Sequence, residues 1–520
     1  MGRWAQTPMD RRQTPLFCPT LDATIPEDHP VRLFDELLRS LDWSLWEARY
    51  VLRLGQPAVH PRIGAAVILY ALSQGFRSSR RIEWALRNAL DYIWLAEGHT
   101  LDHSTICGFR TKFAQELKDL FRQLGRLAMT MGLVRLNQVA LDGTRIRANS
   151  SRHATATART LQERLTALDA EIERMFAEAS QTDDKDNDLF GENVSPNRLP
   201  KGLADLKSRR EKLAQALENA RGKEAERKGK GRPPRVPVAD PDAKILPNKD
   251  GGFAPNYTPL AVVDGQSGLI VETEVLNHTD EGSVTVPMAD RVTETLGEKP
   301  KQLLADANHG TGLNLAALQA RGIEAYIPME GRLDTKENPA HREDPTTAVP
   351  ESEWSKLPKN PATKKLGRAA FVYDREKDVF YCPMGRRLVF DHLRGRDHRG
   401  DDREYRRYRC ESCEGCPLAR ECLGKEAKRR TVSRDEYEPL REAMDARLKS
   451  VEGKAIYDLR KWVAETPFGH MKGFWRLTQF LLRGLEKVRT EWRWDCTAYN
   501  VWKMAKLIGA MRVRLAVCGG

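Results

Sequence analysis

The amino-acid sequence predicts a mixed α/β core, preceded by an all-helical domain and interrupted by a helical insertion and a cysteine-rich insertion. Three observations support this fold class. From Pro30 to Leu133, apolar residues recur every three or four positions, which is the period of helices. After Gln138, short β-type segments alternate with helical ones. Of the nine cysteines in the chain, five lie between Cys382 and Cys422.

The chain has 520 residues and a formal net charge of +12. We expect about two to four structural units, because this length exceeds one compact core. The basic excess fits a polyanion such as nucleic acid, but many basic proteins bind none. No apolar run approaches the ~18 residues of a membrane span, and the start lacks a secretory signal, so we expect no membrane contact and a cytoplasmic location.

Residues 1–135 are predicted to form the all-helical N-terminal domain. Ser78, Asp102 and Ser104 stand where helix N-caps are expected. A helix-turn-helix DNA-binding domain would suit the basic residues expected on its outer faces, and an interaction domain with a solvated basic face fits the pattern equally well. These basic residues are Arg77, Arg80, Arg81, Arg110 and Lys112.

Residues 136–328 are predicted to form the first part of the core. A strand leads to Asp142, and a charged insertion at 152–235 follows, in which a narrow leucine-rich seam predicts a helical hairpin or a short coiled coil. Two strands around Asp264 then form a β-hairpin. The remaining order is a helix at 283–296, a strand that ends at Asp306, a helix and a strand. The seam residues are Leu161, Leu165, Leu168 and Ile172.

This order of elements is that of a ribonuclease H-like mixed sheet, in which the first and fourth strands are neighbours. Asp142 and Asp306 therefore converge at one sheet edge, although an isolated Asp-Gly more often serves a turn. A third acid is expected from a helix after the fifth strand. We assign it to Glu465, in the C-terminal helical part of the core at 453–515.

Glu465 is an acid within a run of basic and aromatic residues, which suggests an anionic partner. Arg460 lies before it and Lys472 seven residues after it, a step that places Glu465 and Lys472 on one helix face. Pro467 weakens this argument, because it either starts or kinks a helix there. Trp475 is the tryptophan we expect to stack on unpaired bases, although most helical aromatics build core.

Residues 329–452 are predicted to be an insertion with a cysteine cluster. Two-residue gaps let successive thiolates surround one ion, so four of the five cysteines are expected to bind a structural zinc. An iron–sulfur cluster fits the same spacing. The cysteines are Cys382, Cys410, Cys413, Cys416 and Cys422.

With these residues, the chain resembles the DDE transposases of bacterial insertion sequences, in the superfamily with a Tyr-Arg-Glu-Lys signature. It looks closest to the group named after insertion sequence eleven-eighty-two. Besides the cysteine insertion, the resemblance rests on PEDHPVRLFDELL, VALDGTRIRANSS, LLADANHGTGLNLAALQARGIEAYIP and IYDLRKWVAETPFGHMKGFWRLTQFLLRGLEKVRTEW.

The resemblance implies that Asp142, Asp306 and Glu465 bind two magnesium or manganese ions. Activated water would cleave DNA at the transposon ends, and the freed 3′-hydroxyl would attack target DNA. The signature's other positions fall on Tyr457, Arg460 and Lys472, which would contact phosphates. The partners implied are terminal inverted repeats and target DNA, bound by a homodimer in the bacterial nucleoid.

Two positions depart from the family pattern. Four residues separate Arg460 from Glu465 where the signature has three, so Lys461 has the expected spacing. His309 stands where relatives often carry an aromatic residue. Three residues after Asp306, it could reach substrate, but a packed or solvent-facing histidine is the more common interpretation. Two other functions remain open: a metal-dependent nuclease or resolvase on the same core, and a DNA-binding regulator without catalysis.

Overall fold

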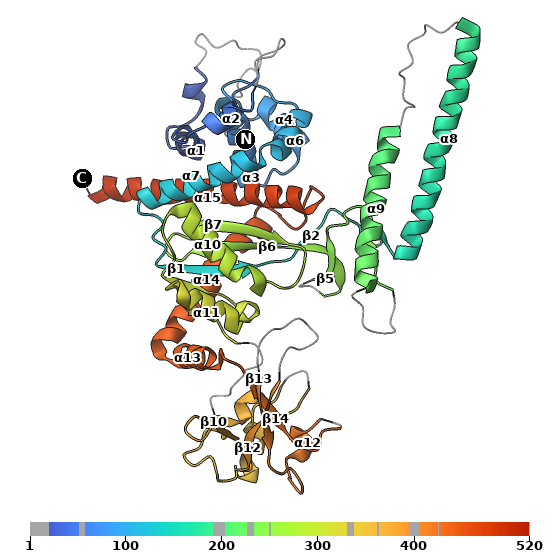
Figure 1. The fold of residues 1–520 in the computed structure, drawn as a ribbon. Helices are drawn as coiled ribbons and strands as arrows, with labels where there is room; N and C mark the ends of the chain where they lie inside the picture. Colours follow the sequence, from blue (N-terminus) through green and yellow to red (C-terminus); the bar gives the residue numbers. More distant parts are fainter. Residues whose placement is uncertain are drawn as a thin grey trace, which may run out of the picture.

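The computed structural model describes residues 20–50, 58–190, 203–225, 233–248, 251–329, 337–360, 363–394, 405–424 and 426–518. Residues 1–19 of the predicted N-terminal domain lie outside this description. Figure 1 shows the N-terminal helices against a long C-terminal helix, α15 (Leu485–Cys518), whose other side faces a central sheet. A helical hairpin and a smaller sheet extend from this core.

The N-terminal region is helical, as predicted. Asp102 caps α6 by accepting a hydrogen bond from the backbone N–H of Thr105, at 2.5 Å, whereas Ser104 lies inside that helix. The helices are α1 (Pro30–Arg39), α2 (Ser44–Glu47), α3 (Pro61–Ser73), α4 (Ser79–Asn88), α5 (Leu90–Leu95), α6 (His103–Lys112) and α7 (Ala114–Thr130).

Two of the basic residues expected on the outer face of this region are not there. Arg110 is buried, and Arg77 forms an ion pair with Glu491 of α15 at 2.6 Å. A buried guanidinium needs a partner, and α15 provides it. Arg80, Arg81 and Lys112 are exposed, so the basic surface is smaller than predicted.

The central sheet has the predicted order. Strand β6 runs antiparallel to both β1 and β7, while β8 is parallel to β1 and β9 is parallel to β8. The strands are β1 (Gln138–Gly143), β2 (Ile146–Arg147), β5 (Lys244–Pro247), β6 (Phe253–Asp264), β7 (Ile270–Leu276), β8 (Gln302–Leu304) and β9 (Glu324–Tyr326).

The two faces of the sheet pack against different helices. Ala140, Leu304 and Tyr326 form a cluster with Ala464 of α14 (Val451–Gly473). Their neighbours along the strands belong to the main core, which includes residues of α10 (Thr285–Leu296) and α11 (Gly312–Ala320). Successive side chains in a strand alternate between faces, so Asp142 shares the α14 face with Ala140.

The helical insertion forms the predicted hairpin. Helices α8 (Ala158–Phe190) and α9 (Leu203–Ala225) contact each other, and β3 (Thr155–Ala156) pairs with β4 (Val236–Pro237) at their base. Leu161 and Leu168 are buried in the seam, and Leu165 and Ile172 pack against it.

The cysteine-rich insertion contains a five-stranded antiparallel sheet that the sequence analysis did not predict. It has its own apolar core, which includes Phe380 and Tyr408. Its elements are β10 (Val372–Asp374), β11 (Val379–Tyr381), β12 (Arg387–Arg394), β13 (Tyr405–Cys410), α12 (Ala419–Cys422) and β14 (Thr431–Arg434), and α13 (Glu438–Lys449) follows. In the part of the chain that the structure describes, no helix is long and apolar enough to cross a membrane.

Candidate functional site

Asp142 lies near the end of β1, on the face that α14 covers. One carboxylate oxygen, Oδ1, accepts a hydrogen bond from the backbone N–H of Gly143 at 2.8 Å. The other, Oδ2, lies 3.2 Å from Nη1 of Arg460 on α14. The contact between α14 and β1 therefore places the signature arginine beside the first acid.

Asp306 follows β8 and caps a short 3₁₀ helix (Ala307–His309). Its Oδ1 accepts a hydrogen bond from the backbone N–H of Asn308 at 2.9 Å. Strands β1 and β8 are parallel neighbours, so their carboxyl ends meet at one edge of the sheet. Burial raises the pKa values of both Tyr457 and Glu281, and the nearby carboxylates of Asp142 and Asp306 raise them further.

The third predicted acid, Glu465, is an exposed residue of α14. The helix runs through Pro467 to Gly473, so Glu465 and Lys472 do share one helix. Lys472 donates hydrogen bonds to Thr144 Oγ1 and, at 2.9 Å, to the Arg145 carbonyl oxygen. Lys472 thus holds the segment after β1. Arg460 of the same helix contacts Asp142.

Tyr457 and Arg460 lie one turn apart on α14. The guanidinium carbon of Arg460 is 5.7 Å from the centre of the Tyr457 ring. Burial raises the pKa of Tyr457, and Arg460 opposes that shift. The phenol is therefore a neutral hydrogen-bonding group beside the acids.

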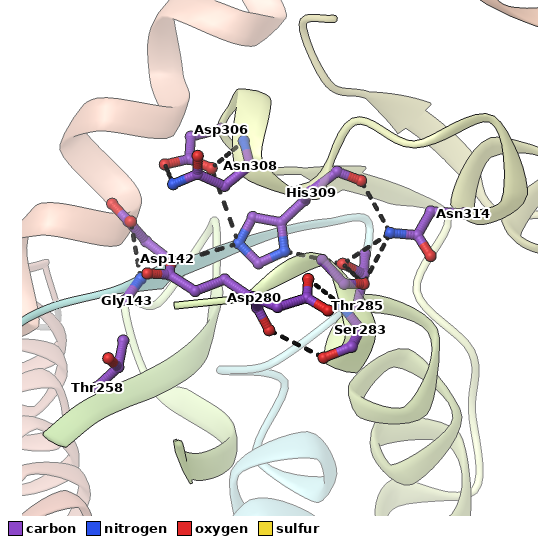
Figure 2. Close-up of polar contacts among 12 residues, drawn as sticks. Asp142, Gly143, Thr258, Asp280, Ser283, Thr285, Asp306, Asn308, His309 and Asn314 are labelled. Atoms are coloured by element: carbon purple, nitrogen blue, oxygen red, sulfur yellow. Dashed lines mark hydrogen bonds and ion pairs between the residues drawn. The ribbon is translucent and has the colours of Figure 1, made fainter. Parts of the chain in front are cut away.

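Two residues that the site assignment missed, Glu281 and His309, lie among the acids. Nε2 of His309 is 3.9 Å from Oδ1 of Asp306 and 4.0 Å from Oε2 of Glu281. Figure 2 shows His309 with Asp306 on one side of its ring and Thr285 on the other. In the sequence, Glu281 follows Asp280 just before a helix. Acidic residues at this position commonly cap or stabilise the helix N-terminus, so the sequence offered no reason to assign Glu281 to the site.

Burial shifts the pKa values of both groups towards their neutral forms. It raises the pKa of Glu281, against the lowering effect of Arg145. It lowers the pKa of His309 to about 4, against the raising effect of Asp306. His309 is fully buried, which agrees with the packed histidine that we weighed as the more common interpretation.

Trp475 does not occupy the position that we predicted for it. Its side chain is 3% exposed and packs edge-to-face against Tyr499 and Trp502 of α15. Stacking on a base would require the ring to leave this core. Two other aromatic residues of the C-terminal segment, Trp462 and Phe474, are 79% and 78% exposed.

The five cysteines of the insertion line one cavity of about 20 Å³. Cys382, Cys410 and Cys422 are buried there, and a hydrogen bond from Cys410 lowers the pKa of Cys382. Cys413 Sγ accepts from the backbone N–H of Arg430 at 3.4 Å. Among the residues described, however, no group of three or more His, Cys, Asp or Glu side chains is already arranged to hold a metal ion, so this geometry does not support zinc.

Two parts of the chain match family models. Residues 381–505 match the model described as "Transposase DDE domain", and residues 19–112 match the one described as "Transposase domain (DUF772)". The DDE match covers the cysteine cluster, α14 and Glu465, but neither Asp142 nor Asp306.

The two matches show that a helical N-terminal region and a C-terminal region of the chain are similar to transposase domains, the second of them to a DDE domain. A DDE domain implies a ribonuclease H-like core, a catalytic function and DNA binding, and proteins with this domain generally use divalent metal ions. Comparisons with curated proteins and with solved structures found no match.

Proposed function

We propose that this chain is the transposase of a bacterial insertion sequence, close to the eleven-eighty-two group, which cleaves DNA at the element's ends and joins the freed 3′-hydroxyl to target DNA. The observation that carries the proposal is the meeting of Asp142 and Asp306 at the ends of two parallel strands, with Arg460 beside them. The match to a DDE domain supports the same reaction.

Asp142, Asp306 and Glu465 would hold the divalent ions, because carboxylate oxygens are the ligands that magnesium and manganese accept. When bound, these ions stabilise negative charge on the attacking and leaving oxygens of a phosphodiester. Asp142 and Asp306 lie at the ends of two parallel neighbouring strands, and α14, which contacts β1, carries Glu465.

Arg460 positions Asp142 through their ion pair, and its remaining N–H groups can donate to a DNA phosphate at the same place. Tyr457 offers a neutral hydroxyl next to it. Lys472 acts indirectly, by fixing the segment after β1 through Thr144 and the Arg145 carbonyl. Exposed Trp462 takes the stacking role that we first assigned to Trp475.

The direct test is magnesium-dependent cleavage of DNA that carries the element's inverted repeats. We expect Asp142→Asn, Asp306→Asn and Glu465→Gln each to reduce cleavage at least about 100-fold, because each removes a charge from the metal site. Asp290→Asn is the matched control. It removes an exposed carboxylate of α10 that pairs with Arg321 at 2.5 Å, so cleavage should be unchanged.

Other results would select the alternative functions. Cleavage without joined product, when a 3′-hydroxyl end is supplied, would indicate a nuclease or resolvase. If Asp142→Asn, Asp306→Asn and Glu465→Gln all still cleave DNA, the proposal that this site is catalytic is wrong, and a DNA-binding regulator is favoured.

The homodimer on DNA and the cytoplasmic, nucleoid-associated location stay predictions. The cysteine site stays a prediction as well. Five thiols line one cavity, but among the described residues they are not arranged to hold an ion, so the sequence spacing alone carries this prediction of zinc or an iron–sulfur cluster. A closed site of this kind would stabilise the insertion and take no part in DNA cleavage.

A further inference from the structure

We propose that two segments of the chain, residues 144–149 and 474–483, together bind the phosphate backbone of double-stranded DNA and lead it away from the acids. We call this pair of segments the arginine ribbon. The inference rests on the proposed function only in taking DNA as the polyanion that is bound. It adds a contact surface outside the three acids and the signature residues.

The arginine ribbon follows the two elements that carry predicted acids. Its first segment comes directly after β1, which ends one residue after Asp142, and its second comes directly after α14, which carries Glu465. The backbone N–H of Arg147 donates to the Thr478 carbonyl oxygen at 3.2 Å, and that of Phe480 donates to the Arg147 carbonyl oxygen at 2.9 Å. These two hydrogen bonds form a parallel bridge, so the segments run side by side in the same direction.

The arginine ribbon is also held at its far end. The side-chain NH₂ group of Asn149 donates to the Leu481 carbonyl oxygen at 2.6 Å, and Nε of Arg483 donates to the Asn149 carbonyl oxygen at 2.9 Å. Between the two ends, Ile146 and Phe480 are buried. The backbone that carries the arginines is therefore in place before DNA arrives, which lowers the entropy lost on binding.

The charge of the arginine ribbon has one sign. Its two segments contain Arg145, Arg147, Arg476 and Arg483 but no Asp or Glu. Arg147 and Arg476 are exposed, and among the residues that the structure describes neither forms an ion pair. Such a guanidinium keeps its N–H donors available, and it can hold a phosphate with two parallel hydrogen bonds. Charge complementarity therefore favours the DNA backbone as the partner.

Arg476 has a backbone conformation that does not suit an arginine. Its φ angle is +55°, in the left-handed region that favours glycine and asparagine. Its side chain is exposed, so packing does not require an arginine either. Residues held in this region cluster at binding sites, where the side chain has a function that compensates for the strain. Binding of a phosphate supplies that function here.

The test measures binding of the full chain to a fluorescent DNA duplex of arbitrary sequence, in the absence of divalent ions and at several salt concentrations. We expect Arg147→Gln and Arg476→Asn each to lower the slope of log affinity against log salt by about 0.9, the value for one phosphate contact. Because such a contact contributes little at 1 M salt, each variant should bind about eightfold more weakly than wild type at 0.1 M salt. Arg476→Lys keeps the charge and should retain the wild-type slope.

Two controls separate the loss of this contact from loss of folding or of overall charge. Asparagine suits the left-handed conformation, so Arg476→Asn should melt at or above the wild-type temperature while it binds DNA more weakly. Arg135→Gln removes an exposed arginine that precedes β1, at the opposite end of the strand from Asp142, and should bind DNA like wild type. Unchanged affinity and slope in Arg147→Gln and Arg476→Asn would overturn the inference. An equal loss in Arg135→Gln would also overturn it, because overall charge would then explain the binding.

The place of the contact on DNA follows from the position of Arg147. An extended chain advances at most about 3.5 Å per residue, so the Cα atoms of Asp142 and Arg147 lie within about 17 Å of each other. Each DNA strand advances 3.4 Å per nucleotide, so the contacted phosphate should lie within about five nucleotides of the cleaved one. Ethylation of phosphates in that range should weaken binding of inverted-repeat DNA by wild type more than by Arg147→Gln. Equal weakening in the two proteins would contradict the inference.

The results also separate this inference from the proposed function. If Asp142→Asn and Asp306→Asn stop DNA cleavage while Arg147→Gln and Arg476→Asn bind DNA like wild type, the inference fails and the function stands. If Arg147→Gln and Arg476→Asn weaken DNA binding as expected but the wild type never cleaves inverted-repeat DNA, the function fails and the inference stands.

Discussion

Asp495 carries a carboxyl group in the interior, on the side of α15 that faces the N-terminal helices. Its side chain is buried, and Oδ2 has no hydrogen-bond partner. Burial raises the pKa of Asp495 to about 7, and the nearby charges of Arg77 and Glu491 act in opposite directions on it. The folded protein therefore keeps this carboxyl protonated under conditions in which an unfolded chain would ionise it.

This difference predicts a pH dependence of stability. The folded state binds one more proton than the unfolded state between pH values of about 4 and about 7, so the free energy of unfolding falls as pH rises through that window. For one proton, the free energy of unfolding can fall by at most about 1.4 kcal/mol per pH unit. Asp495→Asn should remove this fall, so its melting temperature relative to wild type should rise from pH 5 to pH 7. A constant difference would contradict the shifted pKa.

At the scale of elements, the helical hairpin is an insertion whose two ends lie side by side. Ala156 of β3 pairs directly with Val236 of β4, and Thr155 pairs with Pro237. The contacts of α9 with the core include hydrogen bonds from Gln215 to Asp242 and from Asn219 to the Pro241 carbonyl. The fold of the central sheet therefore does not depend on the hairpin for its connectivity.

An Asn-Gly turn that joins Ala156 to Val236 should replace the hairpin, because a two-residue turn fits a directly paired antiparallel register. We expect the shortened protein to be folded, with a melting temperature within about 5 °C of wild type by calorimetry. Joining Ala154 to Val238 is the control, since it also removes β3 and β4 and should be less stable. If the melting temperature falls equally in both shortened proteins, the hairpin itself stabilises the core.

The elements also show how far the sequence could be interpreted. Alternating patterns and turn residues were enough to predict the order β1, β6, β7, β8, β9, because each strand carries its own local signal. The five-stranded sheet around Phe380 and Tyr408 was missed, since its strands lie in a polar, arginine-rich segment without clear alternation. Glu281 was missed for a different reason: its role depends on burial beside β1, which no local pattern encodes.

At the scale of the whole molecule, α15 joins regions that are far apart in the sequence. It contacts α3 and α7 on one side and β7 on the other. Asn500 completes the edge of the sheet, because its side chain accepts from the Ile270 N–H at 2.9 Å and donates to the Ile270 carbonyl at 2.7 Å. Pairing an otherwise open strand edge in this way also protects it from association with other chains.

Glu491 is the polar centre of this junction. Its carboxylate is fully buried, pairs with Arg77 at 2.6 Å, and accepts hydrogen bonds from the backbone N–H groups of Leu481 and Leu482. Arg77 in turn donates to the Gln479 carbonyl at 2.7 Å. One side chain thus connects the N-terminal helices, α15 and the segment after α14.

Glu491→Gln should destabilise the junction, because it leaves Arg77 as a buried charge without a countercharge, a loss of about 3 kcal/mol. We expect a fall in melting temperature of about 6 °C or more, and faster amide hydrogen exchange in α3 and in residues 479–482 than in β1 and β8. Glu486→Gln is the control, since that carboxylate pairs with Arg489 in the same helix and is 82% exposed. If amide exchange instead rises to the same extent throughout the core, the N-terminal helices and the sheet unfold as one unit, and the junction does not open by itself.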